Sequence, residues 1–160
     1  MKRFLPLLLS LFMLTSCAAH TPKRKIEEKD VKRMVYEAVE EERLILLDQE
    51  EIGFVLDIEP EDYSSAWVWQ DRTAATIDEI GIFIAKTGME NALYQQIEGY
   101  LTACKNDKKE WLESYNPIEA AKLANGTLFR YGNCMGYAFL NPDELAELLE
   151  EMNDFYSAEE

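Results

Sequence analysis

Histidine is nearly absent from this chain: its 160 residues include one, His20. A catalytic imidazole or a histidine-rich metal site would have to be built on this single residue. Cysteine is also scarce, and Cys17, Cys104 and Cys134 form no Cys-x-x-Cys pair. That spacing argues against a zinc site and against a dithiol redox centre. We therefore expect a protein that is not an enzyme and that uses no metal and no cofactor.

Positive charge is the second shortage. The chain has 16 Lys and Arg residues against 31 Asp and Glu residues, which gives a net charge of −15. Nucleic acids and anionic lipid surfaces both require basic side chains, so the charge argues against either as a ligand of the folded part. The acidity favours a basic protein partner, or else it serves solubility alone. Hydrophobic residues make up 48% of the chain, too many for a disordered protein.

The N-terminal apolar run, residues 4–14, is about eleven residues long and follows Lys2 and Arg3. A membrane-spanning helix needs roughly 20 apolar residues, so this run suits the core of a secretory signal instead. The run closes with Leu-Thr-Ser and then Cys17. This ending resembles the lipobox of bacterial lipoprotein signal peptides. The resemblance implies cleavage before Cys17 and lipidation of Cys17; a plain secretory signal is the alternative.

This interpretation divides the chain into a signal peptide (1–16), a lipidated tether (17–29) and a single globular domain (30–160). The signal holds two bases and no acid, so the remaining chain is two units more negative than the whole. Fatty acyl chains such as palmitate on Cys17 would anchor it to a membrane. Ala18 stands where an Asp would favour inner-membrane retention, so we predict an outer-membrane lipoprotein facing the periplasm.

The apolar periodicity predicts a mainly α domain of about five to six helices with one small β-hairpin. Helices are expected within 30–47, 73–87, 89–106 and 142–156, and a short one within 117–124. A charged turn is expected at 105–109. The hairpin would pair 127–131 with 134–140 around Gly132-Asn133, although a glycine-interrupted helix is the alternative.

Two further segments are less regular. Residues 54–58 alternate like a short strand but could also continue a helix. Pro60 suits the first position of a helix. Trp67 and Trp69 are two residues apart, so they share a face only if the chain there is extended. They would then fill a core or stack on a sugar.

The two remaining cysteines, Cys104 and Cys134, form an even pair in a chain expected to be exported. In an oxidising compartment such a pair is expected to form a disulfide. Two unpaired buried thiols are the alternative.

Three motifs suggest chemistry. Residues 133–138, Asn-Cys-Met-Gly-Tyr-Ala, resemble the nucleophile region of transglutaminase-like enzymes, but the imidazole which that mechanism needs could come only from His20, far upstream. Glu113-Ser114 resembles the catalytic segment of soluble lytic transglycosylases, which would make Glu113 a general acid; their downstream Gly-Leu-Met-Gln segment is absent. The acidic cluster Asp57, Glu59, Glu61 and Asp62 does not have the spacing of an EF-hand calcium loop.

Cys104, taken together with Cys134-Met-Gly-Tyr137, is similar to the paired cysteines of small helical periplasmic immunity proteins, the Rap1a/Tai group. That resemblance implies an inhibitor-type role. The expected function is an envelope lipoprotein that binds a basic protein partner without catalysis. An assembly lipoprotein of an envelope machine and a cell-wall glycan lyase acting through Glu113 are the alternatives.

Overall fold

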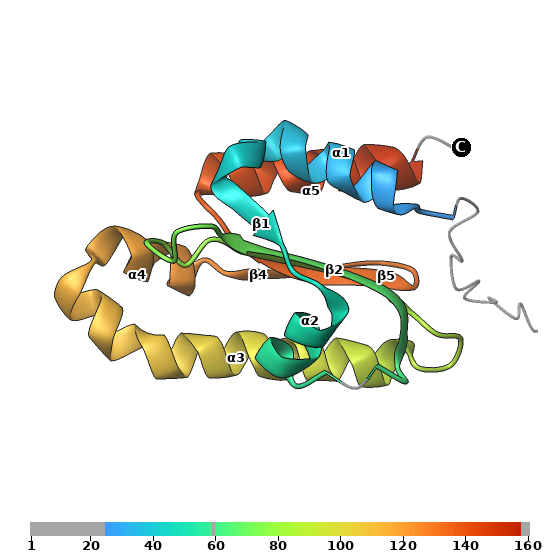
Figure 1. Cartoon of the computed structure of the whole chain (residues 1–160), viewed down its shortest axis with the longest axis horizontal. Helices are drawn as coiled ribbons and strands as arrows, with labels where there is room; N and C mark the ends of the chain where they lie inside the picture. Colours follow the sequence, from blue (N-terminus) through green and yellow to red (C-terminus); the bar gives the residue numbers. More distant parts are fainter. Residues whose placement is uncertain (1–24, 59, 158–160) are drawn as a thin grey trace, which may run out of the picture.

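The structure is a computed structural model that describes residues 25–58 and 60–157. The predicted signal peptide, the lipidation site Cys17 and His20 lie outside the described residues. A five-stranded antiparallel sheet, in the order β1-β2-β3-β5-β4, forms the middle layer (Figure 1). Helices cover both of its faces, which makes a three-layer α/β/α arrangement.

Helices and strands are intermixed along the chain, in the order α1, η1, β1, α2, β2, β3, α3, α4, β4, β5 and α5. The helices are α1 (Glu28–Ala38), α2 (Gln49–Leu56), α3 (Glu90–Tyr115), α4 (Pro117–Ala124) and α5 (Pro142–Ser157), with a 3-10 turn η1 (Glu41–Arg43). The strands are β1 (Leu44–Leu46), β2 (Tyr63–Asp71), β3 (Glu79–Ala85), β4 (Thr127–Tyr131) and β5 (Cys134–Phe139).

Each face of the sheet has its own apolar core. Helices α1 and α5 cover one face, where Val31, Met34 and Met152 are fully buried. Helices α2, α3 and α4 lie on the other face, where Ile52, Leu93 and Ile97 are fully buried. Burying both faces of one sheet removes more apolar surface from water than a single layer would, which stabilises a domain of this size.

The prediction of a mainly helical domain with one hairpin is wrong, because the chain forms five strands in one sheet. The clearest error is the helix expected within 73–87, where the structure has β3. Ile80, Ile82 and Ile84 pack toward α1 and α5, whereas Phe83 and Ala85 pack toward α3. A strand buried on both faces reads as a continuous apolar run, so the two-residue period that marks a strand is hidden.

The helix expected within 30–47 is also too long. Helix α1 ends at Ala38, and the apolar stretch from Leu44 pairs as β1 with the end of β2. Residues 54–56 belong to α2, the helical alternative, which starts with a capping box between Asp48 and Glu51. Pro60 begins a turn, residues 60–62, that leads into β2 and not into a helix.

Predictions that depend on local signals are confirmed. The hairpin of β4 and β5 forms around Gly132, whose φ of +65° suits glycine. Asn116 caps α4, and Pro117 is the first residue of that helix. Helix α5 begins at Pro142. Helix α3 continues beyond the expected end at residue 106, so the charged turn at 105–109 is wrong.

The two tryptophans of β2 do share a face. Trp69 is fully buried and Trp67 packs beside it, both on the side covered by α1 and α5. The extended conformation that this required is therefore the observed one.

The predicted disulfide between Cys104 and Cys134 does not hold in the structure, where both are free and buried. Cys104 lies on α3, in the core of one face, whereas Cys134 lies on β5 and points into the core of the other face. The sheet separates the two sulfur atoms, so no disulfide could form without unfolding one layer. Cys104 and Cys134 are therefore two unpaired buried thiols, which was the alternative.

Candidate functional site

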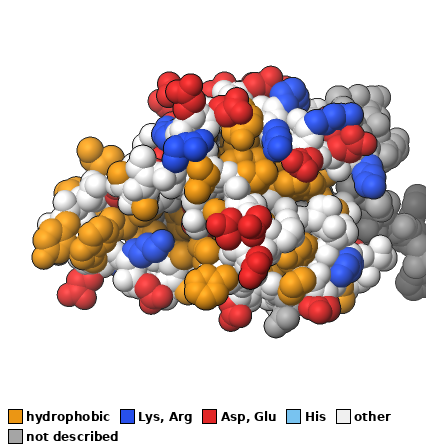
Figure 2. Space-filling model, in the orientation of Figure 1, with side chains coloured by type: hydrophobic (Ala, Val, Ile, Leu, Met, Phe, Trp, Pro, Cys, Tyr) orange, Lys and Arg blue, Asp and Glu red, His pale blue; other side chains and the backbone are white. Residues whose placement is uncertain are grey.

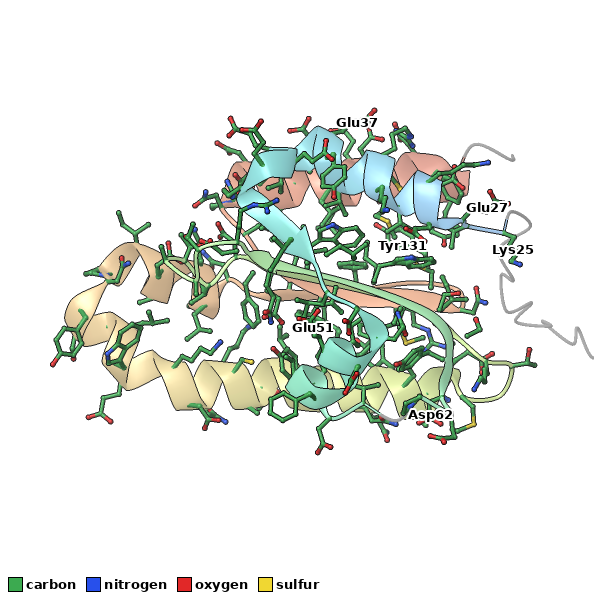
Figure 3. All side chains as sticks on the ribbon, in the orientation of Figure 1. Lys25, Glu27, Glu37, Glu51, Asp62 and Tyr131 are labelled. Carbon is green, nitrogen blue, oxygen red and sulfur yellow. The ribbon has the colours of Figure 1, made fainter. Side chains whose placement is uncertain are left out.

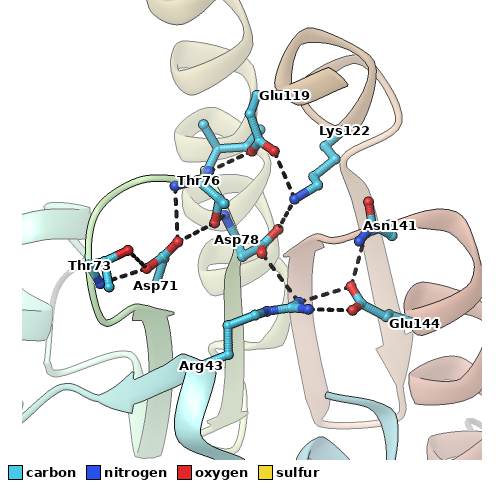
Figure 4. A network of polar contacts seen from close by, with 10 residues as sticks. Arg43, Asp71, Thr73, Thr76, Asp78, Glu119, Lys122, Asn141 and Glu144 are labelled. Carbon is cyan, nitrogen blue, oxygen red and sulfur yellow. Dashed lines mark hydrogen bonds and ion pairs between the residues drawn. The ribbon is translucent and has the colours of Figure 1, made fainter. Parts of the chain in front are cut away.

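A network of charged side chains surrounds Asp78, immediately before β3 (Figure 4). The Asp78 side chain is 1% exposed, and its Oδ1 atom lies 2.7 Å from Nζ of Lys122 on α4. Its Oδ2 atom lies 3.2 Å from the guanidinium of Arg43, at the end of η1. Two cations therefore compensate this buried carboxylate.

The network extends outward through both cations. Lys122 also lies 2.9 Å from Glu119, whose second oxygen accepts a hydrogen bond from the backbone N–H of Ile77. Arg43 donates two hydrogen bonds, of 2.5 and 2.9 Å, to Glu144 at the start of α5. These contacts join η1, the start of β3, α4 and α5.

Electrostatics hold this network in its charged form. Burial disfavours the charged ammonium of Lys122, but hydrogen bonds and charge from Asp78 and Glu119 raise its pKa above the ordinary value. Burial likewise opposes ionisation of Glu144, but Arg43 lowers its pKa. The ion pairs of Asp78 with Lys122 and Arg43 join η1, the start of β3 and α4, which is a structural role.

The loop between β2 and β3 is shaped by Asp71. One carboxylate oxygen accepts from the backbone N–H of Thr73 at 2.6 Å and from its hydroxyl at 2.7 Å; the other accepts from the N–H and hydroxyl of Thr76. Burial works against the charged form, but these four donors lower the pKa of Asp71 to about 2.

Glu79, the next residue after Asp78, has a different environment. It is 6% exposed, and its Oε1 atom accepts hydrogen bonds from Tyr100, at 2.7 Å, and from Tyr137. Its Oε2 atom accepts from the side-chain amide of Gln70 at 2.9 Å. No ion pair to Glu79 occurs among residues 25–58 and 60–157. Glu79 is thus held by neutral donors alone.

The two phenols stay protonated beside Glu79. Burial, followed by the nearby charge of Glu79, raises the pKa of Tyr100 and of Tyr137 well above the ordinary value of a phenol. Both therefore act as hydrogen-bond donors across the neutral pH range, and neither is poised as a base.

A groove runs along α3 beside Glu79; we call it the α3 groove. It consists of two hollows of about 340 and 460 Å³, both of which Lys108 lines. The first is lined by residues that include Gln70, Asp71, Asp78, Glu79, Lys108 and Trp111. The second is lined by residues that include Val55, Asp57, Tyr100, Cys104, Asp107 and Lys108. Volumes of this size are at the lower end of the roughly 300–1,000 Å³ typical of ligand pockets.

Large apolar side chains are exposed beside the groove. Trp111, Tyr115 and Ile118 are 60%, 77% and 70% exposed at the junction of α3 and α4, and we call them the aromatic corner. Figure 2 shows hydrophobic side chains gathered at this end of the molecule. Phe54, on α2, is exposed next to Val55 on the other side of the groove. Exposed apolar groups clustered in this way are typical of an interaction surface.

Glu113, the general acid of the glycan-lyase alternative, lies outside this groove. Its side chain is 58% exposed on α3 and its closest cationic partner is Lys109, at 4.0 Å. A glycosidic general acid works in a cleft, whereas Glu113 lines neither of the two hollows described above.

The other predicted motifs are dispersed. Asp57 ends α2, whereas Asp62 accepts a hydrogen bond from Gln96, and Glu59 lies outside the described residues. Within 25–58 and 60–157, no three His, Cys, Asp or Glu side chains are arranged to hold a metal ion. In that same part of the chain, no helix has the length and apolarity to cross a bilayer.

The sequence offers one weak signal for the residues that matter here. Asp78 and Glu79 directly precede an unbroken apolar run, residues 80–84, which is typical of the polar end of a buried strand. Trp111 carries no signal, because an aromatic residue on a helix is most often part of the core. Comparisons with protein-family models, with curated proteins and with solved structures found no match, so the groove and its charges carry the functional argument.

Proposed function

We propose that this chain is a non-catalytic binding protein of the bacterial cell envelope, anchored through lipid on Cys17, which holds a basic protein partner. The observation that carries this proposal is the exposed aromatic corner on a protein of net charge −15. Protein interfaces are enriched in Trp and Tyr at their centre, and charge of opposite sign steers the partner toward them.

The position of the corner supports a partner in solution. Lys25, the first described residue, lies at one end of the molecule, and the α3–α4 junction lies at the other end (Figures 1 and 3). The 26 residues of α3 span roughly 39 Å. A chain of about eight residues, as from Cys17 to Lys25, reaches at most roughly 28 Å. An anchor at Cys17 would therefore attach the chain at the end of the molecule opposite the aromatic corner, which leaves this corner farthest from the point of attachment.

The pairing of the buried charges beside the groove also favours binding. The buried charges around Asp78 are paired, and the phenols beside Glu79 stay protonated. A binding role needs only this fixed pattern of charge and apolar surface.

The test is capture from envelope extracts of the producing cell, with the purified chain immobilised at low and at moderate salt. We expect basic proteins to be retained at low salt and to be released as salt rises, because screening weakens the attraction. Trp111→Ala should lose the same proteins, whereas Glu113→Gln, outside the groove, should retain them. Recovery of no protein, or capture that is indifferent to salt, would refute the proposal.

The identity of a captured protein separates the two non-catalytic roles. A toxin points to immunity, and a secretion or pilus component points to assembly. Turnover of peptidoglycan by the purified chain, abolished in Glu113→Gln, would replace both with the glycan lyase.

A further inference from the structure

Glu79 is a buried carboxylate that faces the α3 groove without a cation of its own. Removing a carboxylate from water is unfavourable unless charge or hydrogen bonds compensate for it. Asp78 has two cations for this purpose, whereas Glu79 has Gln70, Tyr100 and Tyr137. Glu79 also lines the first hollow of the α3 groove, together with Gln70 and Trp111.

The hollow above Glu79 has a lining that suits one long cationic side chain. Its volume is about 340 Å³, and Asp71 forms part of its wall. Trp111, exposed on α3, lies at the same hollow and offers an aromatic ring to a cation. A cation beside a tryptophan ring gains about 0.5–2 kcal/mol, and a carboxylate partner adds a charge-assisted hydrogen bond.

We infer that the α3 groove binds an amphipathic segment of the partner protein and that a lysine or arginine side chain of this segment enters the hollow above Glu79. This inference rests on the proposed function, because it assigns the surface on which the basic partner docks.

Charge complementarity identifies the occupant. Asp57, Asp71 and Asp107 line the groove together with Glu79, and Lys108 is the basic residue of both hollows. Apolar side chains contribute to both hollows, Val55 to one and Trp111 to the other. A matching segment carries a cation flanked on both sides by apolar residues, as in a groove that binds an amphipathic helix.

Two other occupants fit less well. A second copy of this chain would bring another net charge of −15 to an acidic groove, and like charges repel. An anionic bilayer would meet the same repulsion at Asp57, Asp71 and Asp107. Either occupant would be recognised by the experiment.

The experiment compares two capped peptides, Gly-Leu-Leu-Lys-Leu-Leu-Gly and the same peptide with norleucine in place of lysine. Norleucine keeps the apolar stem and lacks the ammonium group. Binding is measured by titration calorimetry and by amide chemical shifts. We expect the lysine peptide to bind at least tenfold more tightly and to shift amides of β3 and of α3 near Trp111. Equal affinity for the two peptides, or binding of neither, overturns the inference.

Three variants localise the effect. Glu79→Gln keeps an oxygen that accepts from Tyr100 and Tyr137. It should lower the ratio of the affinities for the lysine and norleucine peptides at least tenfold. Trp111→Ala should weaken binding of the lysine peptide at least tenfold. Because Trp111 is exposed, this variant should fold, so it remains a valid test if Glu79→Gln does not fold. Glu113→Gln removes one negative charge from α3, outside the groove. This variant should bind the lysine peptide as tightly as the original chain does.

The remaining outcomes separate the inference from the proposed function. If the chain captures a basic protein and neither groove variant weakens that capture, the partner docks elsewhere: the inference fails and the proposed function stands. If Trp111→Ala instead converts a dimer into a monomer in sedimentation, or abolishes flotation with phosphatidylglycerol vesicles, the occupant is a second copy or a membrane, and the inference is again overturned.

Discussion

Asp78 and Glu79 are neighbours in the chain and both are buried, but their surroundings are opposite. Asp78 is bound by Lys122 and Arg43, which tie it to α4 and η1. Glu79 accepts only from neutral groups and lies at the floor of an open hollow. A carboxylate whose charge is compensated within the fold stabilises that fold. Glu79 has no such ion pair within the described residues, and we propose that a cation of the partner protein binds beside it.

The comparison also separates two kinds of stabilising contact. The Asp78 network joins elements that lie far apart in the sequence, with partners 35 and 44 residues away. Breaking a buried pair leaves an uncompensated charge, whereas removing a neutral donor leaves one unmade hydrogen bond. Substitutions of Lys122 and Tyr137 test this difference directly, and substitutions of Asp71 and Trp111 test the lining of the hollow beside Glu79.

Lys122→Met should have the largest effect. It leaves Asp78 with Arg43 alone and deprives Glu119 of its cation, so we expect a loss of about 3–5 kcal/mol in the free energy of unfolding. Chemical denaturation measures it. Lys109→Met is the matched control, because its pair with Glu113 is exposed and contributes about 1 kcal/mol or less. Similar losses for both variants would show that the Asp78 network is not a major stabilising contact.

Tyr137→Phe should have a smaller effect. It removes one of the three neutral donors to Glu79 from a fully buried site, at a cost of about 1–3 kcal/mol. Tyr131→Phe is the control, because that hydroxyl donates to an uncharged carbonyl, of Leu149, and should cost about 1 kcal/mol. A larger loss for Tyr131→Phe than for Tyr137→Phe would contradict the importance of the Glu79 charge.

Asp71→Asn should cost about 1 kcal/mol at neutral pH, because an amide group replaces the oxygen that accepts from Thr76 and the site is partly solvated. The pKa of Asp71 falls from an ordinary 3.8 to about 2 in the folded chain. Its contribution to stability is therefore complete above pH 4 and is lost as the pH falls toward 2. Denaturation at several pH values should show the two proteins converging over that range; a constant difference would exclude this linkage.

Trp111→Ala should change stability least. The side chain is 60% exposed and contacts the ring of Tyr115 at 6.0 Å between centroids, so we expect a change within about 0.5 kcal/mol. The same variant should lose binding of the basic peptide. A large loss of stability would show that Trp111 is a structural residue. It would contradict the interpretation of the aromatic corner as a binding surface.

The sequence predicts best where the signal is local. Asn116-Pro117 and Pro142 mark two helix starts, and Gly132-Asn133 marks the hairpin, because each depends on the backbone preferences of neighbouring residues. The sequence predicts secondary structure poorly where burial of the side chains decides between helix and strand. The run 80–84 is compatible with a helix or with a strand, and only pairing with β2 and β5 selects the strand.

The charge balance, the scarcity of histidine, the helix starts and the hairpin were determined by the sequence alone, because each depends on composition or on a few adjacent residues. The tertiary structure decided the sheet, the separation of Cys104 from Cys134 by its two faces, and the different partners of Asp78 and Glu79. The reason is physical: these features depend on contacts between residues distant in the chain, which form when both faces of the sheet are buried.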